Sequence, residues 1–299
     1  MRARIASRAR ATAATTALLV LAAACGSSKP VVKPADDLYQ SARDHEQNEY
    51  YDSAIEDYKT LLDNYPLDER AEEVELSIAQ DHYKNEAYPE AIAAFSDFQR
   101  MHPTSARLPE VEYTIGQAYM DQMSTIDRDL AAATNASQRF ESVIVRYPRS
   151  EYADKAREKL KATREHLASR ELYIASFYYR QGKARAARGR ITEVLARYPE
   201  TEASSEALQR VADDARSADD AELARLAEAA LQERTATGGT DASAAPGAAG
   251  SGAAARAATA PRPSPATAAV VAALRDRQGR PDVAAAAAAA HEEPATATP

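Results

Sequence analysis

The sequence predicts an all-α fold, a right-handed solenoid of about five helix pairs followed by a disordered C-terminal tail. Three observations lead to this prediction. One motif occurs four times between residues 54 and 199. It contains one small and two large apolar residues and ends in an aromatic residue or His followed by Pro. A second small residue precedes three of these motifs by twelve positions. Residues 235–299 contain no Phe, Tyr, Ile or Met.

The first 24 residues have the pattern of a signal peptide, because arginines precede an uncharged run over residues 11–24 that is too short to span a bilayer. The segment Leu21-Ala22-Ala23-Ala24-Cys25 resembles the bacterial lipobox. This resemblance implies that Cys25 carries a diacylglycerol and an N-acyl chain at the periplasmic face of the outer membrane. Cleavage at a nearby site, which would leave Cys25 as a free thiol, is the alternative. Residues 25–36 are expected to form an extended tether.

The repeated motif accounts for residues 37–233. Its large residues follow the small one by four and seven positions, which places all three on one face of a helix, and the proline ends that helix. Small residues twelve positions apart let two antiparallel helices cross closely. The four motifs begin at Ala54, Ala91, Ala136 and Ala187 and end at Pro66, Pro103, Pro148 and Pro199.

This pattern resembles the tetratricopeptide repeat, a helix pair of about 34 residues. The expected repeats span about 37–68, 72–105, 109–150, 168–201 and 205–234. Neither Pro nor Gly occurs between Ser150 and Gln181, so an extra helical stretch over 150–168 should join the fourth repeat in one long helix. Residues 234–299 are rich in Ala and Pro and cannot bury a core of their own, so they are expected to be disordered, with at most a transient helix near Val270 to Arg277.

The sequence argues against several classes of function. A pI near 5.3 disfavours nucleic-acid binding, and a single cysteine excludes a disulfide scaffold. No phosphate-binding glycine loop, nucleophile elbow or zinc-binding histidine pair is present. We therefore expect no enzymatic activity, no metal and no cofactor other than the acyl chains on Cys25.

Two sets of residues are candidates for binding other proteins. The first set should line a peptide-binding groove, because its members lie on the first helix of each pair, and Tyr with Arg or Lys suits an extended peptide. These residues are Tyr39, Arg43, Gln80, Tyr83, Lys84, Tyr113 and Gln117. The alternative is that they are ordinary packing and solvated residues.

The second set is a cationic segment that contains no acid between residues 180 and 190 of an otherwise acidic chain. It could dock an acidic partner, since complementary charge speeds and orients association. A merely solvated face is the alternative. The predicted docking residues are Tyr178, Tyr179, Arg180, Arg185, Arg188 and Arg190, with Lys183 between them.

Three motifs carry a resemblance to the BamD family of outer-membrane protein assembly lipoproteins. They are Tyr-Lys-Asn at 83–85, Asp-Arg-Asp at 127–129 and Tyr-Pro-Arg-Ser-Glu-Tyr-Ala from Tyr147. The resemblance covers about residues 35–230 and the lipobox. It implies a non-catalytic subunit whose C-terminal repeats bind the periplasmic part of BamA and whose N-terminal repeats bind unfolded barrel proteins. Arg190 matches an arginine that faces BamA in this family.

Two other lipoproteins with such helix pairs are alternatives. The Tol-Pal coordinator has similar repeats but normally carries an N-terminal coiled coil, which this sequence lacks. A type IV pilus pilotin usually has more regular repeat spacing than the intervals of 45 and 51 residues that separate Pro103, Pro148 and Pro199.

Overall fold

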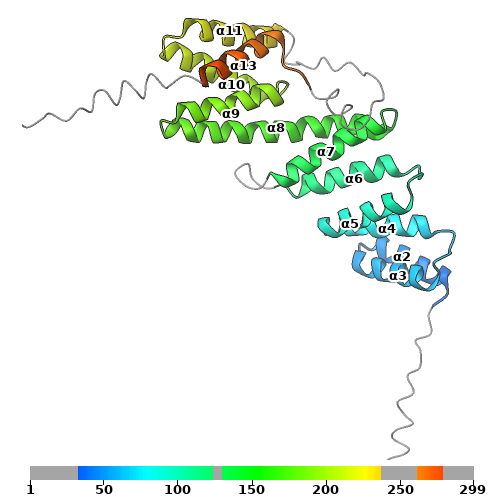
Figure 1. Ribbon diagram of the computed structural model, residues 1–299. Coiled ribbons are helices and arrows are strands. Elements are labelled where there is room, and N and C mark those ends of the chain that lie inside the picture. Colours follow the sequence, from blue (N-terminus) through cyan, green and yellow to red (C-terminus); the bar gives the residue numbers. More distant parts are fainter. Residues whose placement is uncertain (1–32, 124–129, 237–260, 279–299) are drawn as a thin grey trace, which may run out of the picture. The chain divides into compact units, whose positions relative to one another are not determined.

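The computed structural model describes residues 33–123, 130–236 and 261–278, in which every regular element is a helix (Figure 1). The chain divides into two compact units at Glu69 and Arg70. The first unit contains one helix pair, α2 (Ala35–Gln47) and α3 (Tyr51–Asn64). None of the described helices is both long and apolar enough to cross a membrane.

The described part of the second unit contains four further pairs and one additional helix. The pairs are α4 (Ala71–Lys84) with α5 (Tyr88–Met101), α6 (Leu108–Asp121) with α7 (Ala131–Arg146), α8 (Glu151–Arg180) with α9 (Ala184–Arg197), and α10 (Glu202–Ser217) with α11 (Ala221–Ala236). The additional helix is α13 (Pro265–Gln278). The predicted all-α solenoid of about five helix pairs is confirmed.

The predicted crossing residues lie at the centres of the pairs. Ala42 and Ala54 in the first unit, and Ala79 and Ala91 in the second, have no exposed surface. The large residues four positions after the second small residue are also fully buried; they are Tyr58, Phe95, Phe140 and Ile191. In the pair α6–α7 the small residue is Gly116, where a Cβ atom would lie 2.8 Å from Cε1 of Phe140. The small residues are therefore required by the close approach of the two helices.

Each of the four described turns that join the helices of a pair uses a residue with positive φ. These residues are Glu49, Glu86, Gly182 and Asp219. The next backbone N–H donates to a carbonyl in the last turn of the first helix, as from Ala87 to His82 at 2.9 Å and from Lys183 to Tyr178 at 3.0 Å. This hydrogen bond is typical of the left-handed helix C-cap.

The second helices end where the proline motif predicts. The residue before each proline has a ψ angle between 48° and 61°, outside the helical region; these residues are Tyr65, His102, Tyr147 and Tyr198. The proline ring disfavours a helical conformation at the residue that precedes it, which explains the shared geometry.

The long helix predicted between Ser150 and Gln181 is present as α8, which has 30 residues. The Ser150 hydroxyl caps its start by accepting a hydrogen bond from the N–H of Tyr152 at 3.0 Å. The first half of α8 packs on α7, where Ala156 joins Phe140 and Val143 in one buried cluster. Its second half forms the fourth pair with α9.

The expectation of a disordered tail is wrong for residues 265–278, which form α13. Val270, Val271 and Leu274 are buried and join the core formed with α9, α10 and α11. Ion pairs fix the end of α13, where Arg277 donates to Asp220 at 2.6 Å and lies 3.4 Å from Glu222. The composition of the tail was misleading because α13 does not need a hydrophobic core of its own. It packs on the core that the repeats already form. Residues 237–260 and 279–299 lie outside the described residues.

We expect Leu274→Asp to release α13 from the repeats, because an unpaired charge in this fully buried position costs about 3 kcal/mol or more. Trypsin should then cleave after Arg275 and Arg277 faster than in the unmodified protein. Ala272→Asp is the control, since it adds the same charge at an exposed position of the same helix. Equal cleavage rates for the two variants would contradict the docked position of α13.

Candidate functional site

The predicted docking residues lie on one helix hairpin, formed by the end of α8 and the start of α9. The turn between the helices contains Gly182, whose φ of 69° favours glycine. Arg180 and Arg185 are exposed on either side of this turn. Arg188 is half-buried. The hairpin therefore brings the cations of residues 180–190 together, as the sequence predicted, and we call residues 180–190 the basic hairpin.

A carboxylate holds Arg190 in place. Its Nη1 lies 3.0 Å from Oε2 of Glu171 on α8, whose side chain is only 13% exposed. This ion pair links the two helices of the basic hairpin. It also fixes the direction of the guanidinium group, which leaves less entropy to be lost when a partner binds.

The two tyrosines predicted for docking have different surroundings. The ring of Tyr178 packs against the edge of Phe177, with 5.9 Å between the ring centroids. Tyr179 packs against the core, and its hydroxyl faces Asp214 on α10. Burial, and then the nearby carboxylate of Asp214, raises the pKa of Tyr179 above its usual value. Tyr179 therefore supports the stacking of α8 on α10 rather than presenting a free hydroxyl.

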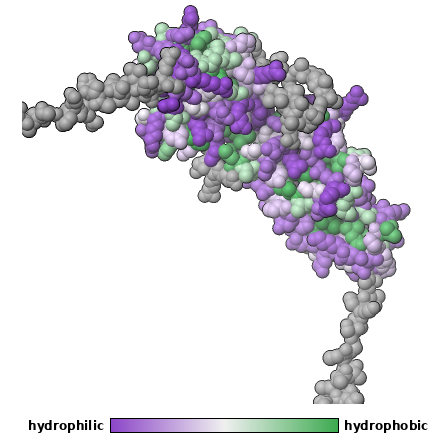
Figure 2. Space-filling model, viewed as in Figure 1, coloured by the Kyte–Doolittle hydropathy of each residue, from purple (hydrophilic) through white to green (hydrophobic). Residues whose placement is uncertain are grey.

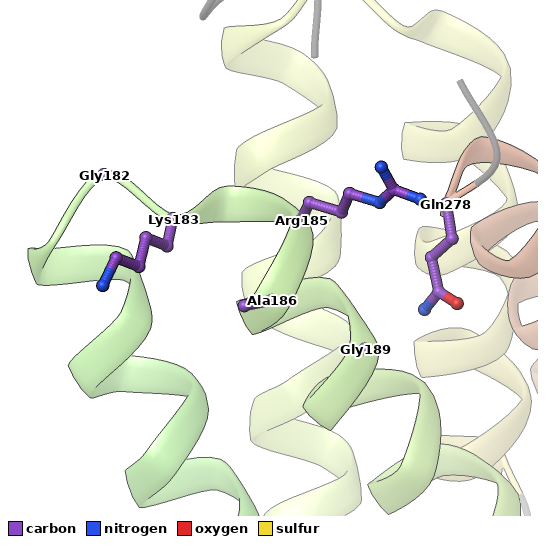
Figure 3. Close-up of a pocket in the computed structure, with 6 residues that line it drawn as sticks. All are labelled: Gly182, Lys183, Arg185, Ala186, Gly189 and Gln278. Atoms are coloured by element: carbon purple, nitrogen blue, oxygen red, sulfur yellow. The ribbon is translucent and has the colours of Figure 1, made fainter. Parts of the chain in front are cut away.

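An open depression of about 660 Å³ lies beside the basic hairpin, between α9 and the end of α13. Figure 3 shows the six residues that line it, Gly182, Lys183, Arg185, Ala186, Gly189 and Gln278. A Cβ atom at Gly189 would lie 3.8 Å from Nε2 of Gln278, so α9 and α13 approach closely here. The sequence analysis missed Gln278 because it treated the tail as disordered.

The predicted groove residues of the first unit lie on α2. The rings of Tyr39 and Tyr58 are 6.2 Å apart, and Arg43 pairs with Glu46 at 2.6 Å. Arg43 is exposed and Tyr39 is half-buried. These two residues belong to a different compact unit from the other five.

The groove residues of the second unit lie on the neighbouring helices α4 and α6. Gln80 donates to Glu110 at 3.1 Å and the Tyr83 hydroxyl donates to Asp121 at 2.6 Å, so both link α4 to α6. Burial, and then this bond to Asp121, raises the pKa of Tyr83. Lys84 instead donates to Asp81 within α4 at 2.9 Å.

Tyr113 and Gln117 lie one turn apart on α6. Tyr113 packs between two rings, at 5.7 Å from Phe140 and 5.5 Å from Tyr152. The pKa of Tyr113 is raised by burial and then by the nearby carboxylate of Glu158. The buried Oε1 of Gln117 has no hydrogen-bond partner among the described residues.

A smaller, polar cavity of about 200 Å³ lies between α6 and α7. Its buried carboxylate, Glu112, accepts hydrogen bonds from Gln99 at 2.5 Å and from Arg139 at 3.4 Å. The Arg139 guanidinium balances the charge of this carboxylate, and the Gln99 amide donates a second hydrogen bond to it. This arrangement is typical of a residue that stabilises the packing of helices. Within residues 33–123, 130–236 and 261–278, no group of three or more acids, histidines or cysteines could hold a metal ion.

Some predicted features fall outside the described residues. Cys25 and the rest of residues 1–32 are among them, as is the Asp-Arg-Asp motif at 127–129. The acyl anchor therefore stays a prediction.

Comparison with known proteins matches this chain to one family and to several curated proteins. A family model named YfiO and described as an outer membrane lipoprotein matches residues 32–228. The chain is 32% identical over 197 residues to the outer membrane protein assembly factor BamD of Vibrio cholerae, covering 62% of this chain and 82% of the relative. The match to BamD of Caulobacter vibrioides is 37% over 93 residues, covering 31% of this chain and 30% of the relative.

A third BamD, from Rickettsia prowazekii, is 32% identical over 94 residues, with 31% of this chain and 38% of the relative covered. The matched region is thus less than half of the Caulobacter and Rickettsia relatives and most of the Vibrio relative. The names of these relatives are those of assembly factors, which agrees with the predicted non-catalytic role.

Proposed function

Because this chain belongs to the family of outer membrane lipoproteins that includes the BamD assembly factors, we propose that it is a scaffold of the machinery that assembles outer-membrane β-barrels. It acts without catalysis, at the periplasmic face of the outer membrane. The single observation that carries this proposal is the family match over residues 32–228, which covers the first four helix pairs and ends within α11 of the fifth.

Its principal partner is the periplasmic part of BamA, bound by the basic hairpin. Arg180, Lys183 and Arg185 are exposed, and Arg190 is held by Glu171 in a fixed direction. Both features suit an acidic surface, because the cations attract it over a distance and the fixed guanidinium pairs with a carboxylate at short range. The favourable charge is local, since the whole chain carries a net charge of −8.

Unfolded barrel proteins bind at two surfaces, one formed by the predicted residues on α2 in the first unit and one formed by those on α4 and α6 in the second unit. Tyr83, Tyr113 and Gln117 support this assignment, because they offer ring surface and hydrogen-bonding groups on neighbouring helices. Most of these polar groups already bond within the chain, so a bound peptide would exchange bonds rather than find free groups. Affinity for any one segment should therefore be modest, which suits a factor that binds many substrates in turn.

An acylated Cys25 holds the protein at the membrane. Each buried methylene contributes about 0.8 kcal/mol, so the acyl chains would make attachment effectively permanent. The segment before α2, including Pro30 and Pro34, separates this anchor from the first helix pair.

Affinity purification of the tagged full-length protein from detergent-solubilised outer membranes tests the proposal. We expect BamA to be recovered with it, and not with an unrelated tagged outer-membrane lipoprotein that serves as the control. Recovery of TolA or of a pilus secretin in place of BamA would overturn the proposal in favour of the Tol-Pal coordinator or the pilotin. Recovery of none of these proteins would also overturn it.

A further inference from the structure

In the third and fifth helix pairs, one face of the first helix packs on the preceding pair. On α6, Val111 and Ile115 lie on this face and join Phe95 and Phe98 of α5 in one buried cluster. They precede the crossing residue Gly116 by five and one positions, and Ala118, two positions after it, is fully buried. On α10, Ala207 and Val211 hold the corresponding places before Ala212, and both are buried in the core shared with α9.

The corresponding face of the fourth pair is open. The residues five and one positions before its crossing residue Ala175 are Arg170 and Ile174, and the residue two positions after it is Phe177. None of these three side chains is fully buried. Phe177 is 45% exposed, and the neighbouring Tyr173, one helical turn before it, is 48% exposed. We call Arg170, Tyr173, Ile174 and Phe177 the open face of α8.

The length of α8 explains why this face is uncovered. The preceding pair already packs on the first half of α8, through the cluster of Ala156 with Phe140 and Val143 of α7. The second half, which pairs with α9, extends beyond α7 (Figure 1). Hydrophobic residues also reach the surface in patches among hydrophilic ones elsewhere on the molecule (Figure 2). Two large aromatic side chains in one helical stripe nevertheless mark a surface suited to a partner.

The acids of α8 near the open face are already engaged by other helices. The only acids between residues 163 and 181 are Glu165 and Glu171. Glu171 pairs with Arg190, while Glu165 accepts hydrogen bonds from the backbone N–H groups of Glu202 at 2.7 Å and Ala203 at 3.0 Å. Both carboxylates are therefore engaged by α9 and α10.

Two cations of this half of α8, Arg170 and Arg180, remain for a partner. Arg170 lies on the open face, and its buried Nε has no hydrogen-bond partner among the described residues. Arg180, exposed at the end of α8, is one turn beyond Phe177. An acceptor that approached along α8 would meet both guanidinium groups, with the two aromatic rings between them.

We propose that the open face of α8 binds an amphipathic, acidic helix of a partner protein, which stacks there as the preceding helix pair stacks on α6 and α10. The apolar side of that helix covers Tyr173 and Phe177, and its carboxylates pair with Arg170 and Arg180. The open face of α8 is a different surface from the α9 side of the basic hairpin. The proposal for the open face therefore does not depend on which partner binds the basic hairpin.

A designed peptide tests this inference with the full-length protein. The probe is a labelled helical peptide of about 20 residues with leucines on one face and glutamates beside them. Fluorescence anisotropy should show binding that weakens about tenfold or more in the double variant Tyr173→Ser and Phe177→Ser. Both side chains are about half exposed, so the variant should keep its thermal unfolding midpoint.

Matched controls identify where the peptide binds. Tyr50→Ser removes a tyrosine that is 64% exposed on the first unit and should leave binding unchanged. A peptide with lysines in place of the glutamates should not bind. Binding that survives the double variant, or a lysine peptide that binds equally well, would overturn the inference.

Sedimentation velocity examines the other possible occupant, a second copy of the chain. We expect the protein to sediment as a monomer at the concentrations used for peptide binding. A dimer that is lost in the double variant would show that the open face binds another copy of this chain, and the partner-helix inference would then be wrong.

Discussion

Replacing Phe140 by alanine should lower the free energy of unfolding by about 3–5 kcal/mol, as is usual when a fully buried aromatic side chain is removed. Phe140 has no exposed surface and packs on Gly116, Tyr113, Val143 and Ala156, so its loss leaves a cavity where α6, α7 and α8 meet. Urea unfolding followed by circular dichroism measures the change.

A double-mutant cycle with Gly116 shows whether the close approach itself matters. Gly116→Ala alone should destabilise the protein by about 1–3 kcal/mol, because its Cβ would lie 2.8 Å from Cε1 of Phe140. In the Phe140→Ala background the same change should cost little, since the space is then empty. Additive costs of the two substitutions would contradict the predicted packing of α6 on α7.

Replacing Cys25 by serine should move the protein from the outer membrane to the soluble periplasmic fraction. Serine cannot form the thioether to diacylglycerol, so the substitution removes the predicted acyl anchor. Fractionation followed by immunoblotting measures the distribution, with loss of nearly all membrane-bound protein as the expected result.

Ser27→Ala is the control for this experiment, because it changes a neighbouring residue and leaves the cysteine in place. We expect that variant to remain in the membrane fraction. A Cys25→Ser protein that still fractionates with the membrane after a salt wash would contradict the acyl anchor.

The helix pairs were predictable because the residues that define the faces and ends of the helices also form the contacts between them. Ala54, Tyr58 and Pro66 illustrate this agreement, since spacing places the first two on one face and the proline ends the helix that carries them. The same residues then form the contact between helices. The absence of Pro and Gly from residues 151–180 similarly predicted the single long helix α8.

The tail helix was not fully predictable because its stability comes from residues far away in the sequence. Val270, Val271 and Leu274 indicated a helical segment, but they are too few to form a core alone. Only the fold shows that α9 and α11 provide the rest of the core. Composition describes what a segment can bury by itself and does not describe the surface against which it can pack.

The candidate sites were predicted as sets of residues but not as contacts. The spacing of cations in residues 180–190 indicated a docking surface, whereas the partner of Arg190, Glu171, lies 19 positions earlier and is found only from the hairpin geometry. Exposure of Tyr173 and Phe177 was likewise hidden, because their spacing on a helix is the same as that of core residues. Counting from Ala175 places Phe177 at the position held by the buried Ala118 in the third pair, so its exposure is found only from the fold.

The measurement that tests the central claim most directly is the affinity of the purified protein for the purified periplasmic part of BamA, at low and at high salt. The account predicts that Arg180→Glu with Arg185→Glu weakens binding about tenfold or more at low salt, and that high salt reduces this difference. The matched pair Arg100→Glu and Arg157→Glu changes the net charge equally at exposed sites outside the basic hairpin and should bind normally. Equal affinities for the two double variants at low salt would contradict the account.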